Sequence, residues 1–225
     1  MSTEESTCWT VIAAAAAGCT AQRAAFAQRY QPVIRAYLVA RWRNTPYLHD
    51  LEDAMQEVFV ACFQRDGLLA RAQRDRPGGF RAFLYGVVRN VARRLEARRS
   101  RDRQAASDVD LNHVPADEES QARLFDRAWA RALLREAALR QEEHARHTGA
   151  AALRRVELLC LRFHEGLPIR AIAARWQIEA ATLHHEYAKA RQEFKTALAE
   201  VVTFHHPGAP EEVERECANL LSFLG

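Results

Sequence analysis

The sequence is poor in cysteine and lacks the short motifs that mark catalytic sites. Its 225 residues include five cysteines, which are scattered, odd in number and form no CxxC pair. This argues against a disulfide framework or a zinc knuckle and predicts reduced thiols in a cytoplasmic protein. The sequence also contains no G-x-S-x-G, no P-loop and no H-E-x-x-H. We therefore predict neither an enzyme nor a bound cofactor or metal.

Long apolar runs are also missing. The nearest approach, residues 11–19 (VIAAAAAGC), looks like the apolar segment and cysteine of a lipoprotein signal. However, Glu4 and Glu5 precede it without a positive charge, and the run is too short to span a bilayer. The sequence predicts a soluble protein with no membrane partner.

Charge is unevenly distributed, although the formal net charge is only +3. Residues 65–103 contain twelve arginines against four acids, whereas residues 104–120 contain five acids and no lysine or arginine. A local basic patch sets the field that a polyanion meets, so this asymmetry matters more than the total.

Helical periodicity dominates, and no convincing strand pattern occurs. We predict an all-α fold of two small helical domains joined by an acidic flexible linker, the second domain containing a helix-turn-helix. The predicted divisions are an N-terminal extension (1–19), a helical bundle (20–101), the acidic linker (102–118), a helix-turn-helix domain (119–202) and an acidic C-terminal helix (203–225). That last helix is expected to pack on the second domain or to cover its DNA face.

The most basic segment, residues 80–103, predicts an amphipathic helix. It contains eight arginines against two acids, with Phe83 and Tyr85 near its start outside the apolar stripe. The segment is either a solvated basic surface or a nucleic-acid surface, in which arginine neutralises phosphates and aromatic rings stack on bases. Its apolar stripe consists of Phe80, Leu84, Val87, Val88, Val91 and Leu95.

The preceding helix, residues 50–63, divides into an apolar and an acidic face. The acidic face is either solvated or a docking face for a basic partner. Leu51, Met55, Val58, Phe59, Cys62 and Phe63 form the predicted buried stripe. Glu52, Asp53, Gln56 and Glu57 form the outer face.

Residues 167–191 have a helix, short turn, helix layout. This is typical of a DNA-binding helix-turn-helix, although an ordinary pair of packed helices has the same pattern. The neighbouring His184 and His185 point about 100° apart on a helix, so they do not suit one metal ion. The predicted core is Ile169, Ile172, Ala173, Ile178, Leu183 and Tyr187.

Two other helices of the second domain have predicted inward faces. For residues 119–146 these are Leu124, Phe125, Trp129, Leu133 and Leu139. For residues 151–164 they are Val156, Leu159, Cys160 and Phe163.

Three segments, in this order, resemble the extracytoplasmic-function (ECF) type of RNA polymerase sigma factor. They are DLEDAMQEVF, FRAFLYGVVRNVARRLEARR and RVELLCLRFHEGLPIRAIAARWQIEAATLHHEYAKAR. The N-terminal and acidic C-terminal appendages resemble a divergent branch of that family. The resemblance implies a promoter-specificity subunit for transcription initiation, with core RNA polymerase and promoter DNA as partners. An anti-sigma factor or a regulatory kinase is left open as a further partner.

The resemblance also implies roles for individual residues. Docking on the clamp of the largest polymerase subunit would use Glu52, Asp53, Gln56 and Glu57. Binding of the minus-ten element would use Arg81, Phe83, Tyr85, Arg89, Asn90, Arg93 and Arg94. The loop that captures a flipped base would contain Arg71, Arg74 and Arg76. Binding of the minus-thirty-five element would use Thr182, His184, His185, Lys189 and Arg191.

The sequence departs from the family pattern at three places. Phe83 stands where many relatives have tryptophan. Gln177 replaces the common turn glycine, so the turn is predicted to form without the left-handed conformation that glycine permits. Histidines and Glu186 replace basic residues in the recognition helix, and Glu186 is expected to repel phosphate. This predicts weak, altered or pH-dependent upstream binding.

Two other functions stay open on the sequence alone. One is a stand-alone helix-turn-helix regulator that binds duplex DNA without polymerase. The other is an inactive sigma-like adaptor that sequesters polymerase or a kinase, which the weakly charged recognition helix favours.

Overall fold

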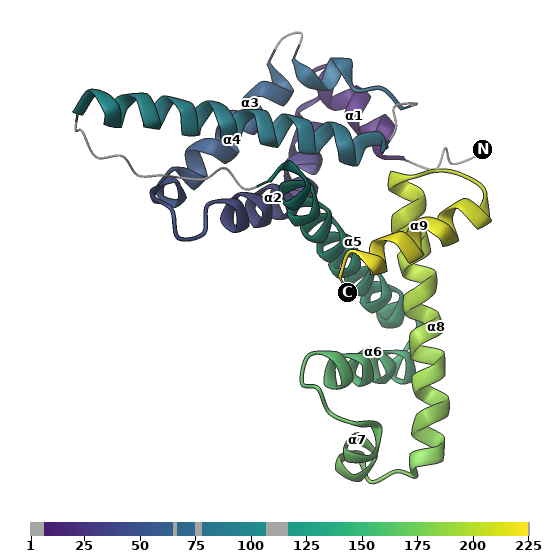
Figure 1. The fold of residues 1–225 in the computed structure, drawn as a ribbon. Coiled ribbons are helices and arrows are strands. Elements are labelled where there is room, and N and C mark those ends of the chain that lie inside the picture. Colours follow the sequence, from purple (N-terminus) through teal and green to yellow (C-terminus); the bar gives the residue numbers. More distant parts are fainter. Residues whose placement is uncertain (1–6, 65–66, 75–77, 107–116, 225) are drawn as a thin grey trace. The chain divides into compact units, whose positions relative to one another are not determined.

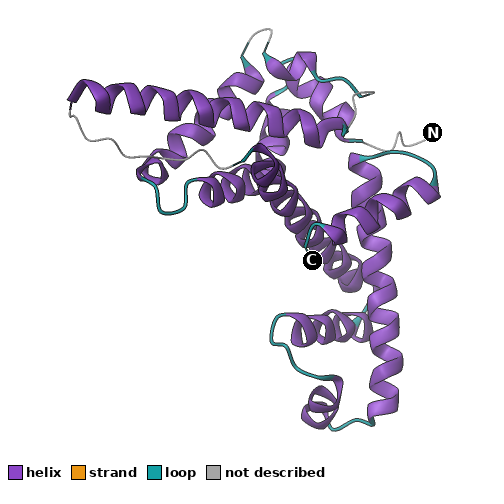
Figure 2. Ribbon diagram, in the orientation of Figure 1, coloured by secondary structure: helices purple, strands orange, loops and turns teal. Residues whose placement is uncertain are grey.

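The computed structural model describes residues 7–64, 67–74, 78–106 and 117–224. Throughout these ranges the secondary structure is helical, with loops between the helices and no strand (Figure 2). This confirms the all-α prediction. Among the described residues, no helix combines the length and apolarity that a membrane span requires.

Figure 1 labels the α-helices of the described chain. Two short 3₁₀ helices, Pro46–Asp50 and Leu68–Arg71, flank α3. The α-helices are α1 (Cys8–Ala16), α2 (Thr20–Arg41), α3 (Leu51–Phe63), α4 (Gly79–Ala106), α5 (Glu118–Thr148), α6 (Ala150–Phe163), α7 (Ile169–Trp176), α8 (Ala180–His205) and α9 (Pro210–Ser222).

The chain divides into two compact units. The first unit contains the described residues of Met1–Ala132, Phe204–Pro207 and Ala218–Gly225, and the second contains Leu133–Thr203 and Gly208–Cys217. The predicted domain boundaries stay a prediction. Residues 107–116 of the predicted linker lie outside the described residues, while α4 continues to Ala106.

An aromatic core organises the first unit. Helix α2 packs on α1 and α3, and α3 packs on α4. Phe26 and Tyr30 of α2 are buried, and their rings lie 5.8 Å and 4.9 Å from the ring of Phe80 of α4. Tertiary packing of these rings explains why the stripe of α4 faces inward.

Helix α1 was not predicted as an element, yet it is part of the first unit. Its residues Cys8, Ile12 and Ala15 are buried. Arg23 of α2 donates from Nε to the carbonyl oxygen of Ala15 at 3.0 Å and from Nη2 to that of Phe63 at 2.8 Å. The Arg23 guanidinium therefore supplies hydrogen bonds to carbonyl groups at the C-terminal ends of both α1 and α3.

Residues from the C-terminal part of the chain complete the first unit. His205 is buried, with its Nδ1 3.4 Å from the hydroxyl oxygen of Tyr30 and its ring 5.2 Å from that of Trp129. The thiol of Cys8 donates to the carbonyl oxygen of His205 at 3.4 Å. Burial raises the pKa of Cys8 to about 12, so this thiol stays protonated at neutral pH.

The second unit packs around the helix-turn-helix core that the sequence predicts. Ile172 and Ala173 of α7 and Leu183 of α8 are buried with Leu158 and Leu161 of α6. Partly buried apolar side chains close this core, namely Leu167, Ile169, Trp176, Ile178, Ala180 and Tyr187.

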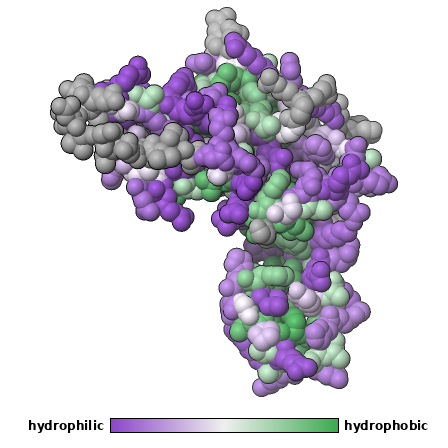
Figure 3. Space-filling model, in the orientation of Figure 1, coloured by the Kyte–Doolittle hydropathy of each residue, from purple (hydrophilic) through white to green (hydrophobic). Residues whose placement is uncertain are grey.

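The predicted inward face of α6 is wrong. Phe163 is 67% exposed and Cys160 is exposed, whereas Leu158 and Leu161 are buried. Apolar residues occur on both sides of this helix, so periodicity alone could not choose the buried side. Leu139 of α5, also predicted inward, is 61% exposed. Figure 3 shows hydrophobic side chains at the surface of the second unit.

The turn between α7 and α8 is not made as predicted. Gln177 itself adopts the left-handed conformation, with φ 55° and ψ 41°, and caps α7. A residue with a Cβ atom pays about 1–2 kcal/mol for this conformation, which glycine adopts freely. The turn therefore keeps the geometry usual for glycine at an energetic cost.

We expect Gln177→Gly to stabilise the second unit by about 0.5–1 kcal/mol, because relief of the left-handed strain exceeds the extra chain entropy of glycine. Hydrogen exchange of the α7 and α8 amides in the full chain measures this as slower exchange. Gln177→Ala retains the strain and is the control. Equal protection in the two variants would contradict the explanation.

Candidate nucleic-acid interface and docking face

The acidic residues of α3 lie on the outside of the first unit, as predicted. Glu52, Asp53 and Gln56 are exposed, and Glu57 is partly exposed. Glu52 forms an ion pair with Arg35 of α2, and Glu57 lies 3.2 Å from Nη2 of Arg98. These exposed pairs are weak, so a basic partner can compete for the carboxylates.

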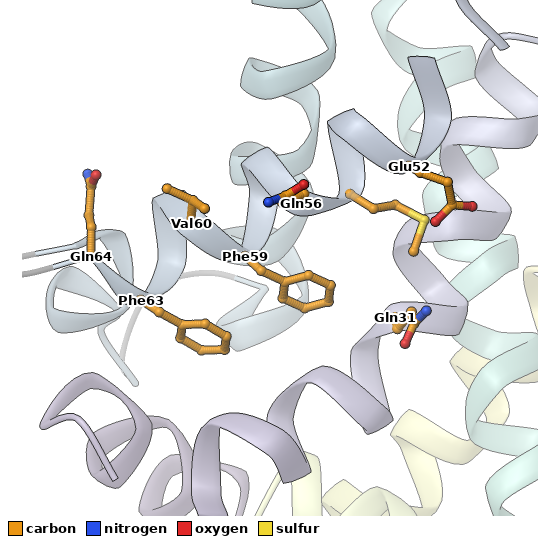
Figure 4. Close-up of a pocket in the computed structure, with 8 residues that line it drawn as sticks. Gln31, Glu52, Gln56, Phe59, Val60, Phe63 and Gln64 are labelled. Atoms are coloured by element: carbon orange, nitrogen blue, oxygen red, sulfur yellow. The ribbon is translucent and has the colours of Figure 1, made fainter. Parts of the chain in front are cut away.

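A groove with a volume of about 610 Å³ lies beside this acidic face. The rings of Phe59 and Phe63 point from α3 toward α2, while Val60 is exposed on α3 (Figure 4). Both phenylalanines are only partly buried, so the predicted stripe of α3 is less buried at its C-terminal end. The lining residues are Gln31, Glu52, Met55, Gln56, Phe59, Val60, Phe63 and Gln64.

The apolar stripe of α4 is confirmed. Each predicted residue from Phe80 to Leu95 is buried, with at most 4% of its surface exposed. This fixes the rotation of α4 and therefore the direction of its arginines.

The polar residues predicted to meet DNA fall into two groups. Asn90, Arg93 and Arg94 are exposed. The second group is only partly exposed and consists of Arg81, Phe83, Tyr85 and Arg89.

Carboxylates of α5 occupy much of this basic face. Asp126 lies 3.1 Å from Nη1 of Arg81. Glu118 lies 3.4 Å from Nη1 of Arg93 and 3.7 Å from that of Arg89. Three of the arginines predicted to bind phosphate are thus paired with acids of the same unit.

Aromatic residues cover the same face. The ring of Tyr85 lies 5.3 Å from Phe125 of α5 and 5.9 Å from Tyr37 of α2. Burial raises the pKa of Tyr85, which keeps the phenol neutral. The guanidinium of Arg81 lies 4.9 Å from the ring centre of Phe223.

Sequence reasoning missed these contacts. It placed Phe125 and Trp129 inward but assigned residues 119–202 to the helix-turn-helix domain. The available signal was the alternation of charge: an acidic segment follows the most basic one. Such complementarity indicates that two segments can pair, but it does not identify the residues that meet.

Glu96, an acid on the basic helix, anchors α4 to α2. Its two carboxylate oxygens accept hydrogen bonds from Arg41 Nε and Nη2 at 2.7 Å and 2.8 Å, and Oε1 accepts another from Trp42 Nε1 at 2.7 Å. Arg41 Nη1 also donates to Gln121 of α5 at 3.0 Å. Burial disfavours the charge on Arg41, but the hydrogen bonds and charge attraction from Glu96 and Tyr37 together outweigh it and raise the pKa of the guanidinium.

The loop predicted to capture a flipped base is only partly described. Arg71 and Arg74 are exposed, and Arg71 ends a short 3₁₀ helix. Arg76 lies outside the described residues. The predicted role of this loop stays a prediction.

The predicted recognition residues of α8 all face solvent in the second unit. Each of them is exposed, whereas Leu183 on the same helix is buried. Arg191 also lies 5.8 Å from the ring centre of Tyr187. The set comprises Thr182, His184, His185, Lys189 and Arg191.

Glu186 is held within an ion-pair cluster. Lys189 donates to its Oε1 at 3.1 Å, and Arg155 of α6 donates to its Oε2 at 3.2 Å. The hydrogen bond from Lys189, followed by that from Arg155, lowers the pKa of Glu186. These cations reduce the expected repulsion of phosphate, while Lys189 is itself partly engaged.

Metal binding finds no support among the described side chains, where no group of three or more His, Cys, Asp or Glu residues could hold an ion.

Comparison with known proteins finds a distant sequence similarity. No protein-family model matches the chain. It is 27% identical over 165 residues to the ECF RNA polymerase sigma factor SigE of Mycolicibacterium smegmatis, which covers 73% of this chain and 58% of that protein. The chain therefore spans less than two thirds of the length of this relative. The similarity relates the protein, at a distance, to the sigma-factor family.

Proposed function

We propose that this protein is an ECF-type RNA polymerase sigma factor that acts in the cytoplasm. It docks on the clamp of the largest polymerase subunit through α3. Helix α4 holds the minus-ten element, and α7 and α8 read the minus-thirty-five element. The protein itself catalyses no reaction and needs no cofactor.

One observation carries the proposal: an exposed acidic helix and a basic helix pack side by side in the first unit. The apolar sides of α3 and α4 face inward, leaving Asp53 and Gln56 on one outer surface and Asn90 and Arg94 on the other. A subunit that joins a basic protein surface to DNA requires this separation of charge. The distant similarity to SigE supports the same function.

The DNA contacts divide by chemistry. Arginines of α4 neutralise phosphates and release counterions, while Phe83 and Tyr85 offer aromatic faces to unpaired bases. Thr182, His184 and His185 offer hydrogen bonds to base edges, and none of them is a lysine or an arginine. Contacts with the minus-thirty-five element therefore contribute sequence specificity, and their affinity depends only weakly on salt concentration.

Run-off transcription tests the proposal. Purified protein is added to core RNA polymerase with genomic promoter fragments, and core binding is measured in parallel by pull-down. The proposal predicts complex formation and transcripts of defined length. No binding to core would overturn it.

Charge reversal should separate docking from DNA binding. Asp53→Arg is expected to weaken core binding at least about tenfold, because it places repulsion in the centre of the docking face. Glu143→Arg, also exposed, makes the same change of net charge in the second unit. Biolayer interferometry with immobilised core measures both variants. Equal losses would contradict docking through α3.

A polymerase-binding adaptor is the second candidate. The cover of α5 over Arg81, Tyr85 and Arg89 favours it, since an adaptor does not need an accessible minus-ten surface. It predicts core binding equal to that of a sigma factor but no promoter-directed transcript.

A further inference from the structure

We propose that residues 118–129 of α5, together with Phe223, form an internal lid over the nucleic-acid face of α4. The lid and single-stranded DNA compete for the same arginines and the same tyrosine ring. This inference rests on the proposed function of α4 and adds its regulation. The chain would therefore be self-inhibited before it meets an open promoter.

Ion pairs are the first observation that supports the lid. Its carboxylates lie within 3.1 to 3.7 Å of guanidinium nitrogens of Arg81, Arg89 and Arg93. The three arginines extend over twelve residues of α4, or about 18 Å of helix. Glu118 and Asp126 thus stand where backbone phosphates would bind.

Aromatic contacts are the second observation that supports the lid. Phe125 lies against the ring of Tyr85, the side chain expected to stack on a base. Phe125 and Trp129 are themselves buried, so they anchor the lid on the first unit. Phe223 lies against Arg81 in addition, so aromatic groups restrict two of the DNA-facing residues.

The N-terminal end of the lid, at Glu118, is held weakly enough to be displaced. The Arg93–Glu118 pair is largely solvent-exposed, at 60% and 72% of the two side chains. Exposed pairs of this kind contribute little and are screened by salt. Asn90 and Arg94 remain outside the lid and give DNA a first point of contact.

Neutral variants of the lid provide the test. Glu118→Gln/Asp126→Asn removes the two lid carboxylates that lie beside arginines of α4. The control, Glu119→Gln/Glu142→Gln, removes the third lid carboxylate, which pairs with Arg123 within α5, and Glu142, which pairs with Arg146 of the same helix. Both double variants change the net charge equally, so long-range attraction of DNA is matched.

Binding of a fluorescent twenty-nucleotide oligo-dT strand is measured by anisotropy with the full chain. The lid variant should bind about fivefold or more tightly than the wild type, and the control variant should change less than twofold. Equal tightening in both variants would overturn the lid, because charge alone would then explain the gain.

Hydrogen exchange of the wild-type chain provides a second measurement that needs no substitution. Saturating oligo-dT should accelerate exchange in residues 118–129 as the lid leaves α4. Slower or unchanged exchange there would overturn the proposal even if the lid variant failed to fold.

Run-off transcription separates this inference from the proposed function. If the wild type and the lid variant transcribe equally and bind oligo-dT equally, the lid proposal is wrong and the proposed sigma function is retained. If neither protein binds core RNA polymerase but the lid variant gains affinity for oligo-dT, the proposed sigma function is wrong and the lid proposal is retained.

Discussion

Glu96→Ala is expected to lower the free energy of unfolding of the first unit by about 3–5 kcal/mol. The carboxylate accepts hydrogen bonds from Arg41 and Trp42, and only 13% of the Arg41 side chain and 17% of the Glu96 side chain are exposed. Its removal leaves a partly buried guanidinium without its counter-charge and an indole N–H without its acceptor.

Urea unfolding followed by tryptophan fluorescence measures the loss. A Trp176→Phe background removes the signal of the second unit, leaving Trp9, Trp42 and Trp129 of the first. Glu52→Ala is the matched control, because Glu52 also pairs with an arginine of α2 but is 71% exposed. That change should cost about 0.5 kcal/mol or less. Similar losses would show that burial does not distinguish the two pairs.

Ile12→Asp is expected to cost about 3 kcal/mol or more, because it places a carboxylate where the native side chain is 3% exposed. The neighbouring Ala13 is exposed on the same helix. Ala13→Asp therefore tests the same charge and helix propensity without burial, and should change stability little.

Thermal unfolding by circular dichroism compares the two aspartate variants. A large loss for Ile12→Asp alone would establish that α1 belongs to the fold of the first unit. If both variants remained as stable as the wild type, α1 would be a dispensable appendage, as the sequence-based division at residue 19 implies.

The buried side of a helix could be predicted where only one side is apolar. In α4, the polar side between Phe80 and Leu95 is marked by Arg81, Arg89, Asn90, Arg93 and Arg94, so the helix has one favoured orientation. In α6, leucine, valine, cysteine and phenylalanine occur on both sides, and packing against α7 selects Leu158 and Leu161. Periodicity cannot make that selection.

Long-range pairs could not be predicted from the sequence. Glu96 is conspicuous as an acid among arginines, but its partners Arg41 and Trp42 lie more than fifty residues away. The candidate DNA surface was located by its composition, whereas its cover by Glu118, Phe125 and Phe223 depends on tertiary packing. Gln177 shows a third limit of sequence-based prediction. It adopts the left-handed conformation that non-glycine residues disfavour, because the packing of α7 against α8 outweighs this local backbone preference.

The position of His205 in the first unit has a consequence for folding during synthesis. About 75 residues separate Ala132 from Pro207, and translation at about 5–20 residues per second needs about 4–15 s to add them. Until then Tyr30 and Trp129 lack the imidazole that packs against them. The core of the first unit therefore stays incomplete during this interval, until the residues around His205 have been synthesised.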